Sequence, residues 1–187
     1  MHRIFSSVAV LAVTAVSAVA PQTALAASAA ELNREAQAAL TALYAKAPAA
    51  SELAKKAKGI LVFPGIVKAG LIVGGQYGEG VLYKGGKVAG YYNVDNVAGG
   101  SYGLQAGAQK YGYALFFISD SALAYLGKSD GFEVGVGPSI VVMDEGLAKS
   151  TTTTTLKDEI YAFIFSQSGL MAGLGLQGNK ITKLDKK

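Results

Sequence analysis

Glycine alternates with bulkier residues along several stretches of this sequence, and this alternation limits the possible fold more than any other feature. Residues 71–83 read LIVGGQYGEGVLY. Alternate residues of a β-strand point to opposite faces of the sheet. One face of this strand would therefore be almost bare in its middle, since it would carry Ile72, Gly74, Gln76, Gly78, Gly80 and Leu82. The same alternation recurs in residues 99–109, 132–139 and 170–177, so we expect four strands with one apolar face and one face of small or polar residues.

Glycine inside a strand costs about 0.5–1 kcal/mol relative to alanine, so these positions need a compensating interaction. Close packing of another element, or strong curvature of the sheet, is the favoured explanation. The alternative is an open slot for a lipid acyl chain or headgroup. The two explanations do not exclude each other.

The first 26 residues have the pattern of a secretory signal peptide. A short positive start precedes an uncharged run from Ile4 to Ala20, and Ala24-Leu25-Ala26 is typical of a cleavage site. We therefore expect residues 27–187 to form a single domain that is exported to the periplasm, the cell envelope or the exterior. The sequence contains no cysteine, which excludes a lipidated N-terminal cysteine and any disulfide-linked partner.

Helical signals come first in this domain and strand signals follow. Ser28 and Glu31 form a capping box before a helical pattern that ends before Pro48, and a shorter helix is expected after Ser51. Further on, Ser119 would cap a short helix at residues 120–126. The expected strands are residues 60–63 (closed by Pro64-Gly65), 71–83, 88–94, 99–109, 113–119, 132–143, 160–166, 170–177 and 180–184, with a two-glycine hairpin turn at residues 84–87. The predicted fold is α+β, with N-terminal helices packed on a strongly curved antiparallel β-sheet that closes, in one version, into a small barrel.

Few residues with catalytic chemistry remain once the predicted signal peptide is removed. His2 is the single histidine and it lies in that peptide, so a Ser-His-Asp triad, a cysteine nucleophile and a typical zinc site are all excluded. The neighbouring carboxylates at positions 144–145, at 158–159, and at 130 and 133 are best explained as solvated loop charges. Residues 173–178 match the G-x-G-x-x-G pattern of dinucleotide-binding loops, but the nine residues that follow leave no room for the helix and the acidic residue that such a loop needs. Residues 80–87 resemble a phosphate-binding loop that is one residue out of register, so they are better explained as a hairpin turn. We expect no enzyme, no metal and no cofactor, with a carboxylate-dependent hydrolase as a distant alternative.

The charge of the chain, formally +4, is too small and too dispersed for a nucleic-acid-binding surface. A mild positive charge is compatible with attraction to an anionic membrane. The lysines at positions 55, 56, 58, 180, 183, 186 and 187 either form solvated faces or supply a basic rim for phosphate headgroups.

Several sequence blocks resemble one known family. The segments AKGILVFPGIVKAGLIVGGQYGEGVLY, GYYN, GSYGLQAGAQ, ALFF, SDGFEVGVGPSIVV and SGLMAGLGLQGNKIT are similar, in this order, to the SYLF-domain family, and specifically to its secreted bacterial branch. The resemblance covers residues 54–181 and implies a lipid-binding protein without catalytic residues. Eukaryotic members bind phosphoinositides and act at membranes and actin. They carry a Trp-Ser pair where this chain has Tyr91-Tyr92, so the resemblance implies a general lipid or membrane-surface role.

The resulting hypothesis is a non-catalytic protein of the bacterial cell envelope that binds a lipid or phospholipid or associates with a membrane surface. Its alternative is a small outer-membrane β-barrel or a structural protein of the envelope. The proposed apolar contacts are Phe63, Ile66, Tyr77, Tyr83, Tyr91 and Tyr92, and the proposed headgroup partners are Lys55, Lys56, Lys58 and Lys68. The remaining proposed lipid-binding positions are Gly74, Gln76, Gly78 and Gly80.

Overall fold

A computed structural model describes residues 27–70, 74–96, 107–128, 132–133, 137–143, 157–169 and 179–186. The predicted signal peptide lies outside these residues, as do the strand expected at 170–177 and most of the one expected at 99–109. The elements are α1 (Ala29–Lys46), α2 (Pro48–Lys56), β1 (Gly59–Gly70), β2 (Gly74–Lys84), β3 (Lys87–Asn96), β4 (Gly107–Phe117), α3 (Asp120–Tyr125), β5 (Phe132–Glu133), β6 (Ile140–Met143), β7 (Ile160–Gly169) and β8 (Lys180–Leu184). No helix among the described residues is both long enough and apolar enough to span a membrane.

The helices begin where capping residues stand in the sequence. Ser28 caps α1, because its side chain accepts a hydrogen bond from the backbone N–H of Glu31, and Ser119 caps α3 in the same way through the N–H of Ala122. The expectation that α2 starts after Ser51 is wrong. This helix begins at Pro48, whose fixed φ and missing N–H suit the first helical turn.

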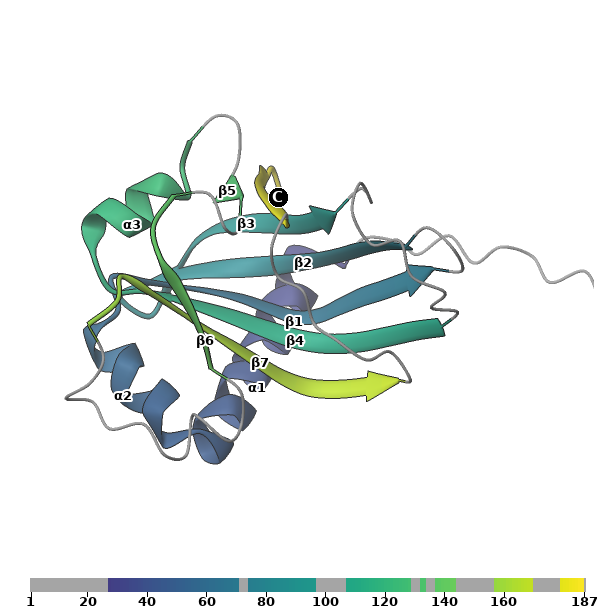
Figure 1. Ribbon diagram of the computed structural model, residues 1–187, viewed down its shortest axis with the longest axis horizontal. Coiled ribbons are helices and arrows are strands. Elements are labelled where there is room, and N and C mark those ends of the chain that lie inside the picture. The colour runs from purple at the N-terminus through teal and green to yellow at the C-terminus, as the bar shows by residue number, and fades with distance from the viewer. Residues whose placement is uncertain are drawn as a thin grey trace, which may run out of the picture.

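The strands form one sheet in the order β5-β8-β3-β2-β1-β4-β7-β6 (Figure 1). All pairs in this order are antiparallel except β6 with β7, which is parallel. Within the described residues the order ends at β5 on one side and β6 on the other, so the sheet is open. The α+β class is confirmed, and the barrel-like and fully antiparallel versions of the sheet are wrong.

Two strands differ from their predicted bounds because pairing continues through local irregularities. Pro64-Gly65 does not end β1, because a bulge between Val62 and Gly65 shifts the register and the strand runs on to Gly70. β4 covers parts of both strands expected at 99–109 and 113–119. Residues 132–143 do not form one strand, because β5 pairs with β8 and β6 pairs with β7. The predicted hairpin turn is confirmed between β2 and β3, where Gly85 and Gly86 both have positive φ.

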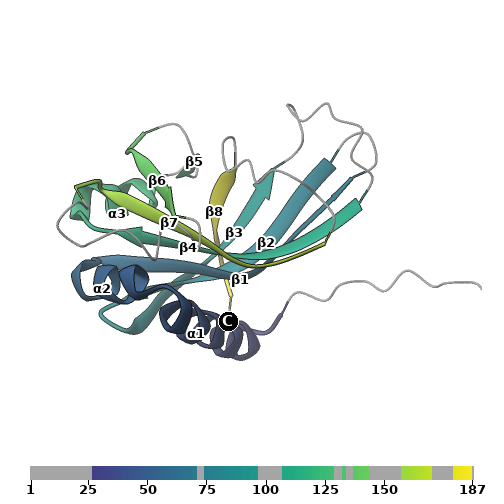
Figure 2. The same ribbon diagram turned by 60° about the horizontal axis from the view of Figure 1, so that its bottom comes forward.

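The sheet has a hydrophobic core on each face (Figure 2). Helices α1 and α2 lie on one side, here called the α1 face, and α3 lies on the other, here called the α3 face. Between these two helices and the sheet, one core buries residues such as Leu43, Val81 and Phe116. The α3 face buries a second cluster that includes Leu61, Phe63, Tyr113 and Leu115.

The bare side of β2 faces this second core, and neighbouring side chains fill it. A Cβ atom added at Gly78 would lie 2.7 Å from Ile66 Cγ1, and one added at Gly80 would lie 2.6 Å from Phe63 Cδ1. Both neighbours belong to β1, and the Phe63 ring also stacks on Tyr113 with centroids 6.2 Å apart. At these two positions glycine therefore makes room for the protein's own core, as the close-packing explanation predicts.

Candidate functional site

The predicted lipid-binding residues do not lie in one place. Phe63 and Ile66 are fully buried in the core of the α3 face, and Tyr92 is 6% exposed there. Gly78 and Gly80 lie beneath the first two of these residues. This group is packed by the chain itself.

Tyr83 and Tyr91 lie instead under α1, on the opposite face. The hydroxyl of Tyr83 donates to the backbone oxygen of Asn33 at 3.3 Å, and the Asn33 amide donates to the Tyr91 hydroxyl at 3.0 Å. These contacts fasten α1 to β2 and β3. Burial raises the pKa of Tyr83 above its usual value.

Tyr77 is the most exposed of the predicted aromatic residues, at 51%. Its hydroxyl donates to Glu79 Oε1 at 3.0 Å, and Glu79 Oε2 lies 2.8 Å from Lys186 Nζ. Partial burial, followed by the bond to Glu79, raises the pKa of Tyr77 to about 12. Lys186 also donates to the backbone oxygen of Ala27, so this network joins the C-terminal segment, β2 and the residues before α1.

A row of polar side chains crosses the far half of the α3 face, near the end of β1. In the register of the sheet, Lys68 on β1 lies opposite Gln76 on β2 and Gln109 on β4. Gln76 is 7% exposed and Gln109 is 4% exposed. We call Lys68, Gln76, Gln109 and the adjacent Tyr111 the polar row. Gly74, at the start of β2, precedes Gln76 by two residues.

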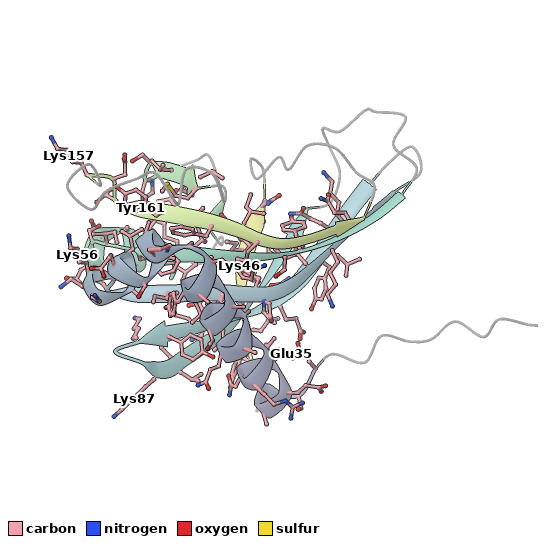
Figure 3. All side chains as sticks on the ribbon, turned by 90° about the horizontal axis from the view of Figure 1, so that it is seen from below. Glu35, Lys46, Lys56, Lys87, Lys157 and Tyr161 are labelled. Atoms are coloured by element: carbon pink, nitrogen blue, oxygen red, sulfur yellow. The ribbon has the colours of Figure 1, made fainter. Side chains whose placement is uncertain are left out.

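Six lysines gather at the other end of the sheet. At this end β1 begins next to the last residue of β4, Lys84 and Lys87 close the β2–β3 hairpin, and β7 begins opposite Phe117. In Figure 3, Lys56, Lys87 and Lys157 all point outward at this end. We call the whole set the lysine edge: Lys55, Lys56, Lys58, Lys84, Lys87 and Lys157, all exposed.

Three acidic residues at the lysine edge have partners of their own. Glu52 pairs with Lys55 at 2.6 Å. Glu159 accepts hydrogen bonds from Ser119 and Ser121, and Asp158 accepts one from Ser139. Among the described residues, Lys55 is the one lysine of this edge that forms an ion pair. The six lysines of this edge outnumber the described carboxylates there, at positions 52, 120, 158 and 159, so the edge carries a net positive charge.

Sequence reasoning missed half of both sets. The sequence places Lys84 and Lys87 in a hairpin turn and gives Lys157 no role. No local pattern shows that the hairpin lies at the same end of the sheet as α2 and the start of β7. Gln109 and Tyr111 were missed for the same reason. Their signal was their place in the alternating pattern of β4, but their neighbours depend on the pairing of β4 with β1.

The described carboxylates do not form a metal cluster. No group of three or more histidine, cysteine or acidic side chains comes together in the described ranges. Asp158 and Glu159 have the serine contacts given above, while the carboxylates at positions 130, 144 and 145 lie outside the described residues.

Comparison with known proteins bears on the C-terminal half. Residues 98–187 match the family model Ysc84, described as Las17-binding protein actin regulator. This part of the chain is therefore similar to the Ysc84 (SYLF) family. The match confirms the resemblance to the SYLF family, while the secreted bacterial branch stays a prediction. The matched residues include β4 to β8, and with them Gln109 and Tyr111 of the polar row. No curated protein matches the chain.

Proposed function

We propose that this SYLF-like protein is a non-catalytic component of the bacterial cell envelope that associates with anionic phospholipid surfaces. The lysine edge carries the proposal. Its six exposed lysines come from the end of α2, the α2–β1 connection, the β2–β3 hairpin and the residues just before β7, yet they lie at one end of the sheet. The resemblance to lipid-binding SYLF domains and the signal-peptide pattern of residues 1–26 support the same function and location.

The composition of the edge suits a membrane surface. Lysine presents a compact point charge, which binds phosphate without demanding the planar geometry that arginine favours. Each lysine near an anionic surface contributes about 1 kcal/mol of attraction. Val88, beside Lys87 at the start of β3, is 42% exposed and adds an apolar group to the same end.

Association with vesicles tests the proposal. The purified protein should sediment with vesicles of phosphatidylserine and phosphatidylcholine, should not sediment with phosphatidylcholine alone, and should be released as salt is added. The double variant Lys56→Glu and Lys87→Glu should bind at least about thirtyfold more weakly, which corresponds to about 1 kcal/mol for each lysine.

A matched variant controls for total charge. Lys46→Glu with Lys183→Glu changes the charge equally at two exposed lysines away from the edge, and it should bind like the wild type. Equal weakening by both double variants would contradict a specific edge, and absence of binding to anionic vesicles by the folded wild type would contradict the function.

A further inference from the structure

The polar row contains hydrogen-bonding groups that the protein leaves unused. The Tyr111 hydroxyl donates to Gln76 Oε1 at 2.9 Å, which fixes the Gln76 amide and leaves its Nε2 group without a partner among the described residues. In the same part of the chain, the Oε1 atom of Gln109 is also buried without a partner. Buried polar groups in native proteins are nearly always paired, so an unpaired donor and an unpaired acceptor in one row need an explanation.

Lys68 lies between these two amides and is partly buried. It forms no ion pair with any described residue. The acidic residues of the central strands β3, β2, β1 and β4 are Glu79 and Asp95, and both lie on the opposite face of the sheet. Glu79 pairs with Lys186, and Asp95 accepts a hydrogen bond from Asn93. The row therefore offers a positive charge, a free N–H donor and a free oxygen acceptor on one face.

We propose that the polar row is a binding site for a phosphate ester that carries a free hydroxyl group, such as a glycerophosphate headgroup. The Lys68 ammonium and the Gln76 amide N–H groups bind the phosphate oxygens, and Gln109 Oε1 accepts from the ligand hydroxyl. Neighbouring strands are about 4.8 Å apart, so the α-carbons of Gln76 and Gln109 are about 10 Å apart, and their side chains can reach both ends of such a group. A cation would not suit the row, because Lys68 stands at its centre.

This site is separate from the lysine edge. Lys68 lies nine positions along β1 from Gly59, which is at that edge, and this corresponds to about 30 Å of extended strand. The inference does not depend on the proposed association with membrane surfaces, since its ligand is a single headgroup.

Binding of soluble headgroups tests it. Calorimetry on the purified protein should detect binding of glycerol 3-phosphate, and the side-chain amide NMR signals of Gln76 and Gln109 should shift. Lys68→Met should weaken binding at least tenfold, while Lys68→Arg should stay within about threefold of the wild type. Lys87→Met, a control at the lysine edge, should leave binding unchanged. No binding by the folded wild type, or equal binding by Lys68→Met, would overturn the proposal.

Two further ligands test whether the site recognises the free hydroxyl group and whether its natural ligand is a lipid or a free ester. Methyl phosphate, which lacks a free hydroxyl, should bind several-fold more weakly than glycerol 3-phosphate, and equal binding would overturn the role assigned to Gln109. Short-chain phosphatidylglycerol that binds more than tenfold more tightly than glycerol 3-phosphate would identify a lipid as the source. Equal affinity of the two would identify the free ester. If Lys68→Met does not fold, Lys68→Gln provides the same comparison.

Discussion

At the residue scale, the two glycines of β2 answer the question raised by the alternating sequence. Gly78 lies directly opposite Ile66, while Gly80 lies opposite the bulge that contains Phe63. The bulge tilts the β1 side chains across β2, and a Cβ on either glycine would occupy the same space. The residues that compensate for these glycines are therefore the largest apolar side chains of the adjacent strand.

Gly80→Ala should destabilise the protein by about 1–3 kcal/mol, because its Cβ would lie 2.7 Å from the backbone oxygen of Val62 as well as against the Phe63 ring. Gly90→Ala is the matched control, since a Cβ there would meet Tyr92 Cε2 at an ordinary 3.5 Å. Urea unfolding followed by circular dichroism should show a loss for the first variant and little change or a small gain for the second. Similar effects of the two would show that crowding does not decide the choice of glycine.

The buried tyrosines of β4 should make the fold sensitive to alkali. Burial raises the pKa of Tyr111 to about 12 and also raises the pKa of Tyr113. Below pH 10 neither the folded nor the unfolded state ionises these groups. Between pH 10 and 12 the unfolded state releases their protons first, so the free energy of unfolding should fall by about 1.4 kcal/mol per pH unit for each tyrosine. Urea unfolding at a series of pH values measures this slope.

The variant Tyr111→Phe separates this effect from a general loss of stability in alkali. It should lower stability at neutral pH, because it removes the bond to Gln76, but its slope between pH 10 and 12 should be smaller than that of the wild type. An unchanged slope would contradict the link between the burial of Tyr111 and the pH dependence.

At the scale of elements, the sequence predicted the features that depend on residues close together in the chain. The caps at Ser28 and Ser119 and the turn at Gly85-Gly86 were predicted because each depends on residues a few positions apart. The run of β1 past Pro64 and the separation of β5 from β6 were not predicted, since each depends on a partner strand far away in the sequence. The polar row and the lysine edge belong to this second group.

The ion pair of Lys186 should stabilise the attachment of the C-terminal segment. Lys186 and Glu79 have side chains only 11% and 10% exposed, so removal of one leaves a nearly buried charge without its partner. Lys186→Met should therefore lower the free energy of unfolding by about 2–4 kcal/mol, and Glu79→Met with Lys186→Met should cost less than the sum of the two single changes. Additive effects in urea unfolding would show that the pair does not couple β2 to this segment.

At the scale of the whole molecule, the two proposed binding surfaces lie at opposite ends of the same strands. The lysine edge surrounds the start of β1, and the polar row crosses its far half. The hydrophobic cores on both faces of the sheet lie between the two surfaces. A molecule attached to a membrane by the lysine edge would hold its polar row away from that membrane.

This separation predicts that the two binding events are independent. The affinity for glycerol 3-phosphate should be the same, within about threefold, for the free protein and for protein bound to phosphatidylserine vesicles, because each ligand meets charges that the other does not contact. Conversely, Lys68→Met should not change vesicle binding, and Lys56→Glu with Lys87→Glu should not change the affinity for the soluble ester. Equilibrium dialysis with and without vesicles measures the affinity for the ester in the two states. Sedimentation measures the effect of Lys68→Met on vesicle binding, and calorimetry measures the effect of the double variant on ester binding. Competition between vesicles and ester would contradict the independence of the two surfaces.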